Sequence, residues 1–304
     1  MVKEPGSILL RIIDEYARRV LEIVEEKGPS GLKKEKPRLL RETGEALAAL
    51  TAEASRAKIA LARKLLDEQA RGLLETGYTV VVIDAQLRDR GLVGAGGGLL
   101  ASVLEMGLAW DLLLDLPYVP GSSFKGAVSA FAEALVGCDR PGAECRDTPR
   151  KRAAGELTAL RTLFGESSGS GGSMGSLLFL DGYPVEPGRR GALVAPAVIT
   201  PHYHRGGEPC RYEYEAKPVP VQHIVLASGT VFRFIVAFPL DRADEVAGAL
   251  RTLGLRVGNG SAAVGVAALI ASALEKGGIG ARTTKGYGVF RLVSVHAARP
   301  RTGA

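Results

Sequence analysis

One short segment combines small residues, hydroxyls and a lysine in an order that suits an anion. It reads Gly121-Ser-Ser-Phe-Lys-Gly126 and precedes a predicted helix over residues 127–135, with serine expected at its cap. Free backbone amides and the positive end of a helix dipole favour a phosphate at such a place. A plain helix cap explains the segment equally well. The spacing is not that of a Walker A loop, so nucleotide hydrolysis is not expected. The candidate phosphate contacts are Gly121, Ser122, Ser123 and Lys125.

A second segment, residues 277–288, is rich in glycine and carries several donors. It reads Gly-Gly-Ile-Gly-Ala-Arg-Thr-Thr-Lys-Gly-Tyr-Gly, and its glycines allow a ligand close to the backbone. No clear strand precedes it, and no acidic residue stands where it could bind a ribose hydroxyl, so a dinucleotide site is not expected. Residues 285–290 partly resemble the first RNP motif of RNA-recognition domains, although Leu292 stands where an aromatic residue is expected. The candidate phosphate donors are Arg282, Thr283, Thr284 and Lys285, while Tyr287 would stack on a base or fill the core.

Histidines supply a third set of candidates. His202 and His204 alternate within Pro201-His-Tyr-His-Arg205, where they could bind metal, act as acid and base, or contact RNA. No third ligand is visible nearby, so no metal or other cofactor is expected. We assign His202 and Arg205 to RNA contact. His223 and His296 stand alone in strand-like surroundings, which favours structural roles.

Composition narrows the class of protein. The chain has 304 residues, of which 46% are hydrophobic, and a formal net charge of +6, which is compatible with a polyanionic partner. A single asparagine and ample charged residues indicate a thermophilic source. Cys138, Cys145 and Cys210 are too few for a disulfide framework, although a bond between the first two stays open. Without a secretory signal or an apolar run of bilayer length, a cytoplasmic protein with no membrane partner is expected.

The elements that would position these residues fall into two regions. Residues 1–76 read as a helical region, broken near residues 27–31 and resuming at about residues 47–74, that packs on the core or on a partner. Residues 77–304 read as a second domain with exposed insertions near 137–155 and 167–176. Along the sequence, its predicted strands occur in pairs or singly between a few helices and do not alternate regularly with them. This order favours an α+β fold with a mainly antiparallel sheet. The expected strands are 78–83, 177–180, 224–226, 230–238 and 289–295, and the further helices are 242–253 and 264–274.

Several blocks, taken in order, resemble the RAMP superfamily of CRISPR proteins. They are Gly94-Ala-Gly96, Leu104-Glu-Met-Gly107, Leu116-Pro-Tyr-Val-Pro-Gly-Ser-Ser-Phe-Lys-Gly126, Val198-Ile-Thr-Pro-His-Tyr203, Pro218-Val-Pro-Val-Gln222 and Gly278-Ile-Gly-Ala-Arg-Thr-Thr-Lys-Gly-Tyr-Gly288. The ordered set is most similar to the sixth-subunit family of the type III-B (Cmr) effectors and covers about residues 77–295. Two positions depart from the pattern: Phe124 replaces an aliphatic residue, and Ser129 stands where an arginine often follows the motif.

The resemblance implies a ferredoxin-like core, similar to an RNA-recognition domain, and a role as a non-catalytic RNA-binding subunit. Such a subunit holds guide RNA near its 3′ end, meets target RNA, and contacts other RAMP subunits and small helical subunits. Two alternatives stay open. The first is a RAMP endoribonuclease that processes guide precursors, with His202 or His204 as general base. The second is a protein–protein adaptor whose N-terminal helices dock a neighbour and which does not touch RNA.

Overall fold

The computed structural model of the protein describes most of the chain. The described residues are 6–137, 154–166, 172–200, 204–205, 208–209, 212, 220–258 and 261–300. The predicted insertion at 137–155 lies almost entirely outside them, as does the first half of the one at 167–176. His202 and the three cysteines, Cys138, Cys145 and Cys210, also lie outside the described residues. The disulfide that the sequence left open between Cys138 and Cys145 therefore stays untested.

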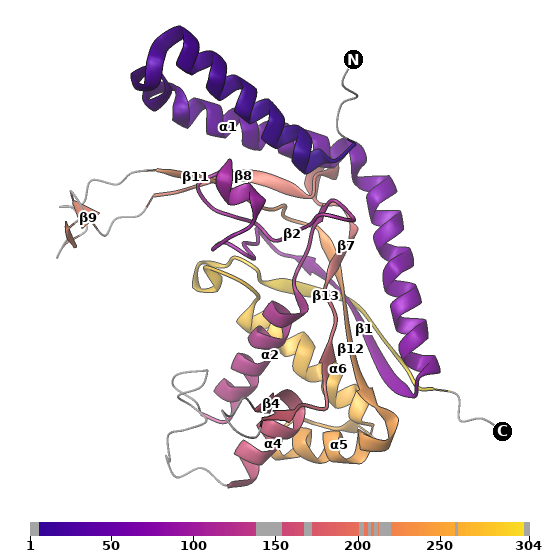
Figure 1. Ribbon diagram of the computed structural model, residues 1–304. Coiled ribbons are helices and arrows are strands. Elements are labelled where there is room, and N and C mark those ends of the chain that lie inside the picture. Colours follow the sequence, from indigo (N-terminus) through magenta and orange to yellow (C-terminus); the bar gives the residue numbers. More distant parts are fainter. Residues whose placement is uncertain are drawn as a thin grey trace.

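One antiparallel sheet of five strands forms the centre of the molecule (Figure 1). Strands β13 (Phe290–Ala298), β1 (Tyr78–Leu87), β12 (Val231–Pro239) and β6 (Leu178–Phe179) lie in that order, and β7 (Tyr183–Glu186) also pairs with β12. Along the chain β1 is followed by a helix, then by β6 and β12, then by further helices and β13. The spatial order is therefore fourth, first, third and second strand of a β-α-β-β-α-β unit, the ferredoxin-like arrangement. The predicted α+β fold is confirmed.

Strand β12 shows why this sheet is buried on both faces. Phe232, Phe234 and Phe238 belong to one hydrophobic cluster, whereas Ile235 and Ala237 belong to another. Successive side chains of a strand point to opposite faces, so the two clusters lie on opposite sides of the sheet. A strand buried on both faces reads as a continuous apolar run rather than an alternating one.

Four helices cover the first of these faces (Figure 1). They are α2 (Gly121–Leu135), α4 (Ala154–Phe164), α5 (Ala243–Thr252) and α6 (Ala262–Ser272), and α6 continues into the π-helical turn η6 (Ala273–Gly277). The predicted helices at 242–253 and 264–274 are confirmed to within a few residues. The helix predicted at 127–135 begins earlier than expected, at Gly121, so the Gly-Ser-Ser-Phe-Lys-Gly segment is itself helical.

The N-terminal helix α1 (Ile8–Glu75) covers the other face after reversing its direction. Gly28 has a φ of 68°, a left-handed conformation that glycine adopts at no steric cost, and the predicted break is confirmed there. An ion pair between Arg19 and Glu42 joins the two arms of the reversal. The helix resumes directly after the turn, well before predicted residue 47. Pro29 falls in its first turn, where proline is tolerated, and Pro37 lies further along it. The last part of α1 packs Ile59, Ala62 and Leu66 on the sheet.

Several small elements complete the described chain. Strands β8 (Val194–Ile199) and β11 (Val221–Leu226) form an antiparallel hairpin that points away from the sheet and leads to β9 (His204–Arg205) and β10 (Glu208–Pro209) (Figure 1). Two short pairs are β2 (Trp110–Asp111) with β3 (Leu116–Pro117), and β4 (Gly165–Glu166) with β5 (Ser173–Met174). The 3₁₀ turns are η1 (Leu99–Ser102), η2 (Arg189–Gly191), η4 (Leu240–Arg242) and η7 (Thr283–Lys285). Among the described helices, none has the length and apolarity needed to cross a membrane.

A buried carboxylate ties α1 to the turn between β2 and β3. Asp115 is 4% exposed and has a φ of 53°, which aspartate tolerates better than most residues. Its side chain accepts five hydrogen bonds, from Ser7 Oγ (3.1 Å), Ile8 N (2.6 Å), Leu9 N (3.3 Å), Lys58 Nζ (2.8 Å) and Trp110 Nε1 (3.0 Å). Burial raises the pKa of Asp115, but Lys58 and the other donors outweigh it and hold the pKa below its usual value. One side chain therefore joins the first turn of α1, its later part and the β2–β3 turn.

We expect Asp115→Asn to lower the free energy of unfolding by about 2–4 kcal/mol at pH 7, because it removes one charge of a buried ion pair. Asparagine keeps the size of the side chain and tolerates the positive φ. Since folding depresses the pKa of Asp115, its contribution is present above the unfolded pKa, near about 4, and is lost as pH falls through the folded pKa. Urea unfolding from pH 7 to 3 measures the effect.

The matched control is Asp14→Asn, since within the described residues Asp14 makes only an exposed i,i+4 ion pair with Arg18. Its effect should stay below about 0.5 kcal/mol. A cost for Asp115→Asn that matches this control, or that does not shrink in acid, would contradict the assignment.

Candidate nucleic-acid interface

The glycine-rich segment 277–288 is held against the chain that leaves β1. Ala281 N donates to Leu92 O (2.8 Å), Gly288 N donates to Arg90 O (2.8 Å), and Ile279 N donates to Gly288 O (2.8 Å). At Gly288, where φ is 64°, an added Cβ would collide with the carbonyl oxygen of Ile279. These bonds make the segment a fixed loop rather than a free strand of glycines.

Cationic side chains project from this fixed loop. Arg282 and Lys285 are exposed and make no ion pair with any described residue, and Thr283 is half-buried beside them in η7. The Tyr287 ring is 9% exposed, with the Arg90 and Arg282 guanidinium carbons over it at 5.6 and 5.7 Å from its centroid. Cation–π attraction at these distances holds both guanidinium groups in place. Of the two roles predicted for Tyr287, this burial favours filling the core.

Arg90 was not among the residues singled out in the sequence. The signal that could have found it is its place: it follows β1 and directly precedes the first glycine-dense loop, which starts at Gly91. Its exposed ion pair with Asp89 (3.5 Å) neutralises it only weakly. Arg90 and Arg282 thus form one cationic pair contributed by two loops far apart in the sequence.

His223 of β11 lies close to this pair. It is 2% exposed, its Nδ1 is 3.4 Å from Val221 O, and its Nε2 has no hydrogen-bond partner among the described residues. Burial lowers the pKa of His223, and the positive charges of Arg282 and Arg90 lower it further, although the contact with Val221 opposes them. The ring is therefore uncharged at neutral pH, in keeping with the structural role predicted for it.

The first turn of α2 differs from the predicted helix cap. The cap position is held by Pro120, whose side chain makes no capping bond, so serine at the cap was wrong. The Gly121 amide instead donates to Asp181 Oδ1 (2.6 Å), which places an anion of the protein at the helix N-terminus. Phe124 is fully buried, with its ring 5.1 Å from that of Phe179.

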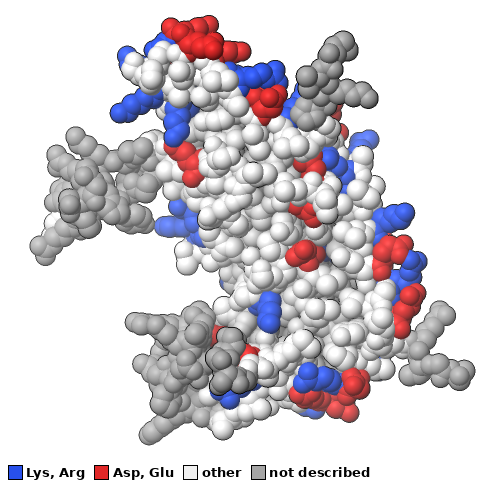
Figure 2. Space-filling model, in the orientation of Figure 1, with Lys and Arg blue, Asp and Glu red and all other residues white. Residues whose placement is uncertain are grey.

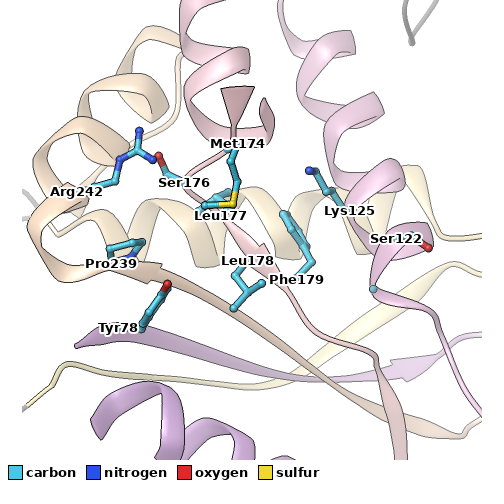
Figure 3. A pocket seen from close by; sticks show the side chains of 12 residues that line it. Tyr78, Ser122, Lys125, Met174, Ser176, Leu177, Leu178, Phe179, Pro239 and Arg242 are labelled. Atoms are coloured by element: carbon cyan, nitrogen blue, oxygen red, sulfur yellow. The ribbon is translucent and has the colours of Figure 1, made fainter. Parts of the chain in front are cut away.

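The side chains of this turn lie on two different faces of α2. Ser123 faces the glycine-rich loop and lines a groove of about 500 Å³ with Phe131, Gly278 and Thr283. Lys125 lies away from that groove, in a separate pocket with Ser122 (Figure 3). The structure therefore brings Ser123 to the predicted donors of the loop but separates Lys125 from them.

Of the third set, His202 lies outside the described residues, and Arg205 lies on a strand away from the glycine-rich loop. His204 and Arg205 form β9, beyond the end of the β8–β11 hairpin that leads away from the sheet (Figure 1). The base of that hairpin, at Leu226, pairs with Gly91 next to the cationic pair. In the described part of the chain, no group of three or more histidine, cysteine, aspartate or glutamate side chains is placed to hold a metal ion.

The net charge is not gathered on the face shown in Figure 2. Basic side chains there stand singly or beside acidic ones, with mixed clusters along the helices, in the part of the face that the structure describes. The case for a nucleic-acid contact therefore rests on the geometry of the glycine-rich loop and much less on the net charge of +6.

Known proteins resemble this chain along most of its length. A curated relative, the CRISPR system CMR subunit Cmr6 of Saccharolobus solfataricus, is 26% identical over 238 residues, which are 78% of this chain and 66% of the relative, just under two thirds of its length. A chain in a structure of the type III-B Cmr-beta complex bound to cognate target RNA shares the fold, with a TM-score of 0.69, 20% identity and coverage of 98% of this chain and 95% of that one. Cmr6 from Pyrococcus furiosus gives a TM-score of 0.41 at 17% identity, covering 71% of this chain and 99% of that one.

The model of the RAMP superfamily matches residues 92–291, well over half of the chain. The match contains both the Gly121–Gly126 segment and the glycine-rich loop. It begins at Leu92, whose carbonyl oxygen accepts the hydrogen bond from Ala281 of that loop. The order of blocks in the sequence, the ferredoxin-like sheet and this match agree, and the chain belongs to the RAMP superfamily.

Proposed function

We propose that the chain is a non-catalytic RNA-binding subunit of a cytoplasmic type III-B (Cmr) ribonucleoprotein. In this proposal it holds guide RNA near its 3′ end, lies close to target RNA, and contacts other RAMP subunits and small helical subunits. The observation that carries it is the fixed glycine-rich loop, which presents Arg282 beside Arg90 and also carries the exposed Lys285. The similarity to Cmr6 and the shared fold with a chain of the Cmr-beta complex support it.

The chemistry of the loop fits contact with the RNA backbone rather than with bases. Guanidinium and ammonium groups bind phosphates without reading sequence. The Tyr287 ring is covered by guanidinium groups, so in this arrangement it positions Arg90 and Arg282 and does not offer a free face to a base. A guide-holding subunit must accept many guide sequences, and backbone contacts allow that. Within the predicted set, Ser123, Arg282, Thr283, Thr284 and Lys285 carry this proposal, with Arg90 added.

We assign no chemical step to this subunit. Cleavage of RNA would need a general base within hydrogen-bond reach of a ribose hydroxyl. His223 is buried and uncharged, and its burial, with two guanidinium groups nearby, explains its lowered pKa without any catalytic role. In our proposal the subunit positions the RNA and supplies positive charge to its phosphates.

We expect Arg282→Ala and Arg90→Ala each to weaken binding of single-stranded RNA about three- to tenfold and to reduce the slope of log affinity against log salt by about 0.7, because each removes one phosphate contact. Fluorescence anisotropy at several salt concentrations measures both quantities. Arg71→Ala is the control, since Arg71 lies in the last part of α1, which packs on the opposite face of the sheet, and pairs there with Glu68. Unchanged affinity and slope in both loop variants would refute the site.

The shape of the loop should matter as much as its charge. Gly286 and Gly288 both have positive φ, but an added Cβ meets nothing within 4 Å at Gly286 and a backbone oxygen at Gly288. Gly286→Ala should therefore cost about 1–2 kcal/mol, and Gly288→Ala roughly 2–5 kcal/mol, in the free energy of unfolding. Urea unfolding gives the cost. RNA affinity at a temperature where both variants are folded should fall for Gly288→Ala more than for Gly286→Ala, and the reverse order would count against a preformed loop.

A further inference from the structure

A pocket on the side of α2 away from the glycine-rich loop has no part in the proposed RNA contact. Its volume is about 300 Å³, and it lies between the first turn of α2, the β5–β6 segment and the end of β12 (Figure 3). Lys125 approaches it from α2, Met174 and Leu178 from the β5–β6 segment, Pro239 from the end of β12 and Arg242 from η4.

Much of this pocket is apolar and open to solvent. Met174 is 89% exposed and Leu178 is 40% exposed, and both border the pocket together with the half-buried Phe179. Exposed large apolar side chains gathered at a hollow mark a place where an apolar group of another molecule is buried. These side chains favour an aliphatic group as the occupant of the pocket.

The polar groups of the pocket call for an anionic oxygen. Lys125 makes no ion pair with any described residue, whereas Arg242 is already held by Glu245 through bonds of 2.7 and 2.8 Å. Ser176 is 3% exposed, and its Oγ is buried without a hydrogen-bond partner in the described part of the chain. Leaving such a hydroxyl unpaired costs about 1–3 kcal/mol, so an occupant that pairs with it is favoured.

A peptide fits this lining better than a nucleotide does. A base needs an open aromatic face on which to stack. The Phe179 ring is stacked on Phe164 at 6.2 Å and meets Phe124 edge-on at 5.1 Å, so it is part of the core. Tyr78, the other aromatic residue of the lining, is half-buried and packs against the hydrophobic cluster on the α1 side of the sheet. The rest of the apolar wall is aliphatic.

We propose that this pocket docks an extended segment of a partner protein in which an aliphatic side chain stands next to a carboxylate. The aliphatic group lies against Met174 and Leu178, the carboxylate pairs with Lys125, and Ser176 Oγ donates its hydrogen bond to the segment. This inference goes beyond the proposed RNA contact and does not depend on it. Helix α2 then presents Ser123 to RNA on one side and Lys125 to protein on the other.

Fluorescence anisotropy with designed peptides tests the proposal. The probes are four fluorescein-labelled Gly/Ser peptides that each carry one Leu and one Asp, separated by zero to three residues. At least one should bind the full-length protein. Lys125→Met should weaken that binding at least about tenfold, because it removes a charge-assisted hydrogen bond. Met174→Ser should also weaken it, and Met174 is too exposed for this change to disturb the core.

Four controls separate the possible outcomes. An Asn-for-Asp probe should bind weakly to the native protein and be insensitive to Lys125→Met. A Lys-for-Asp probe should regain affinity for Lys125→Glu. Lys285→Met should leave peptide binding unchanged, and Lys125→Met should leave RNA affinity and its salt slope unchanged. The proposal is overturned if none of the four probes binds, if binding ignores Lys125, or if single-stranded RNA displaces the peptide.

Discussion

The packing of three phenylalanines places both glycine-containing segments. The Phe234 ring of β12 lies 4.7 Å from the ring of Phe124 in α2 and 5.4 Å from that of Phe290 at the start of β13. Phe124 lies within the Gly121–Gly126 segment, and Phe290 comes two residues after the glycine-rich loop. One central strand therefore fixes the start of α2 and the end of the loop, and through them the groove that both line. Phe124, a departure from the family pattern, is a core residue here and not a ligand.

The fold was predictable from sequence where a local pattern decides it. The continuous apolar run of β12 predicts a strand, and its burial on both faces explains that run. The glycines and proline near residue 28 predict the break in α1. The partner of the first amide of α2 was not predictable, because Asp181, which accepts a hydrogen bond from Gly121 N, lies 60 residues away in the chain. The same holds for Asp115, whose partners range from Ser7 to Trp110. Nothing local marks a carboxylate as buried when its donors come from distant elements.

The candidate site divides in the same way. The ordered blocks identify the loop and its exposed donors, but they do not show which donors share a face. Ser123 and Lys125 are two residues apart, and on a helix of 3.6 residues per turn this separation places them on opposite sides. Helical periodicity would have separated them in the sequence, had the helix been expected to begin at Gly121. Arg90 needed tertiary structure, because only the contact with Tyr287 brings it to Arg282.

A fixed loop also changes what its charges can do. Two guanidinium groups repel each other, and the neutral, buried His223 beside them adds no third positive charge. The Tyr287 ring and the backbone bonds to Leu92 and Arg90 hold these groups together before any anion arrives. A phosphate bound there, as we propose, would meet side chains that folding has already ordered. Under that condition few contacts give useful affinity. The stability of the loop and the affinity for a polyanion that we propose for it are thus two consequences of the same packing.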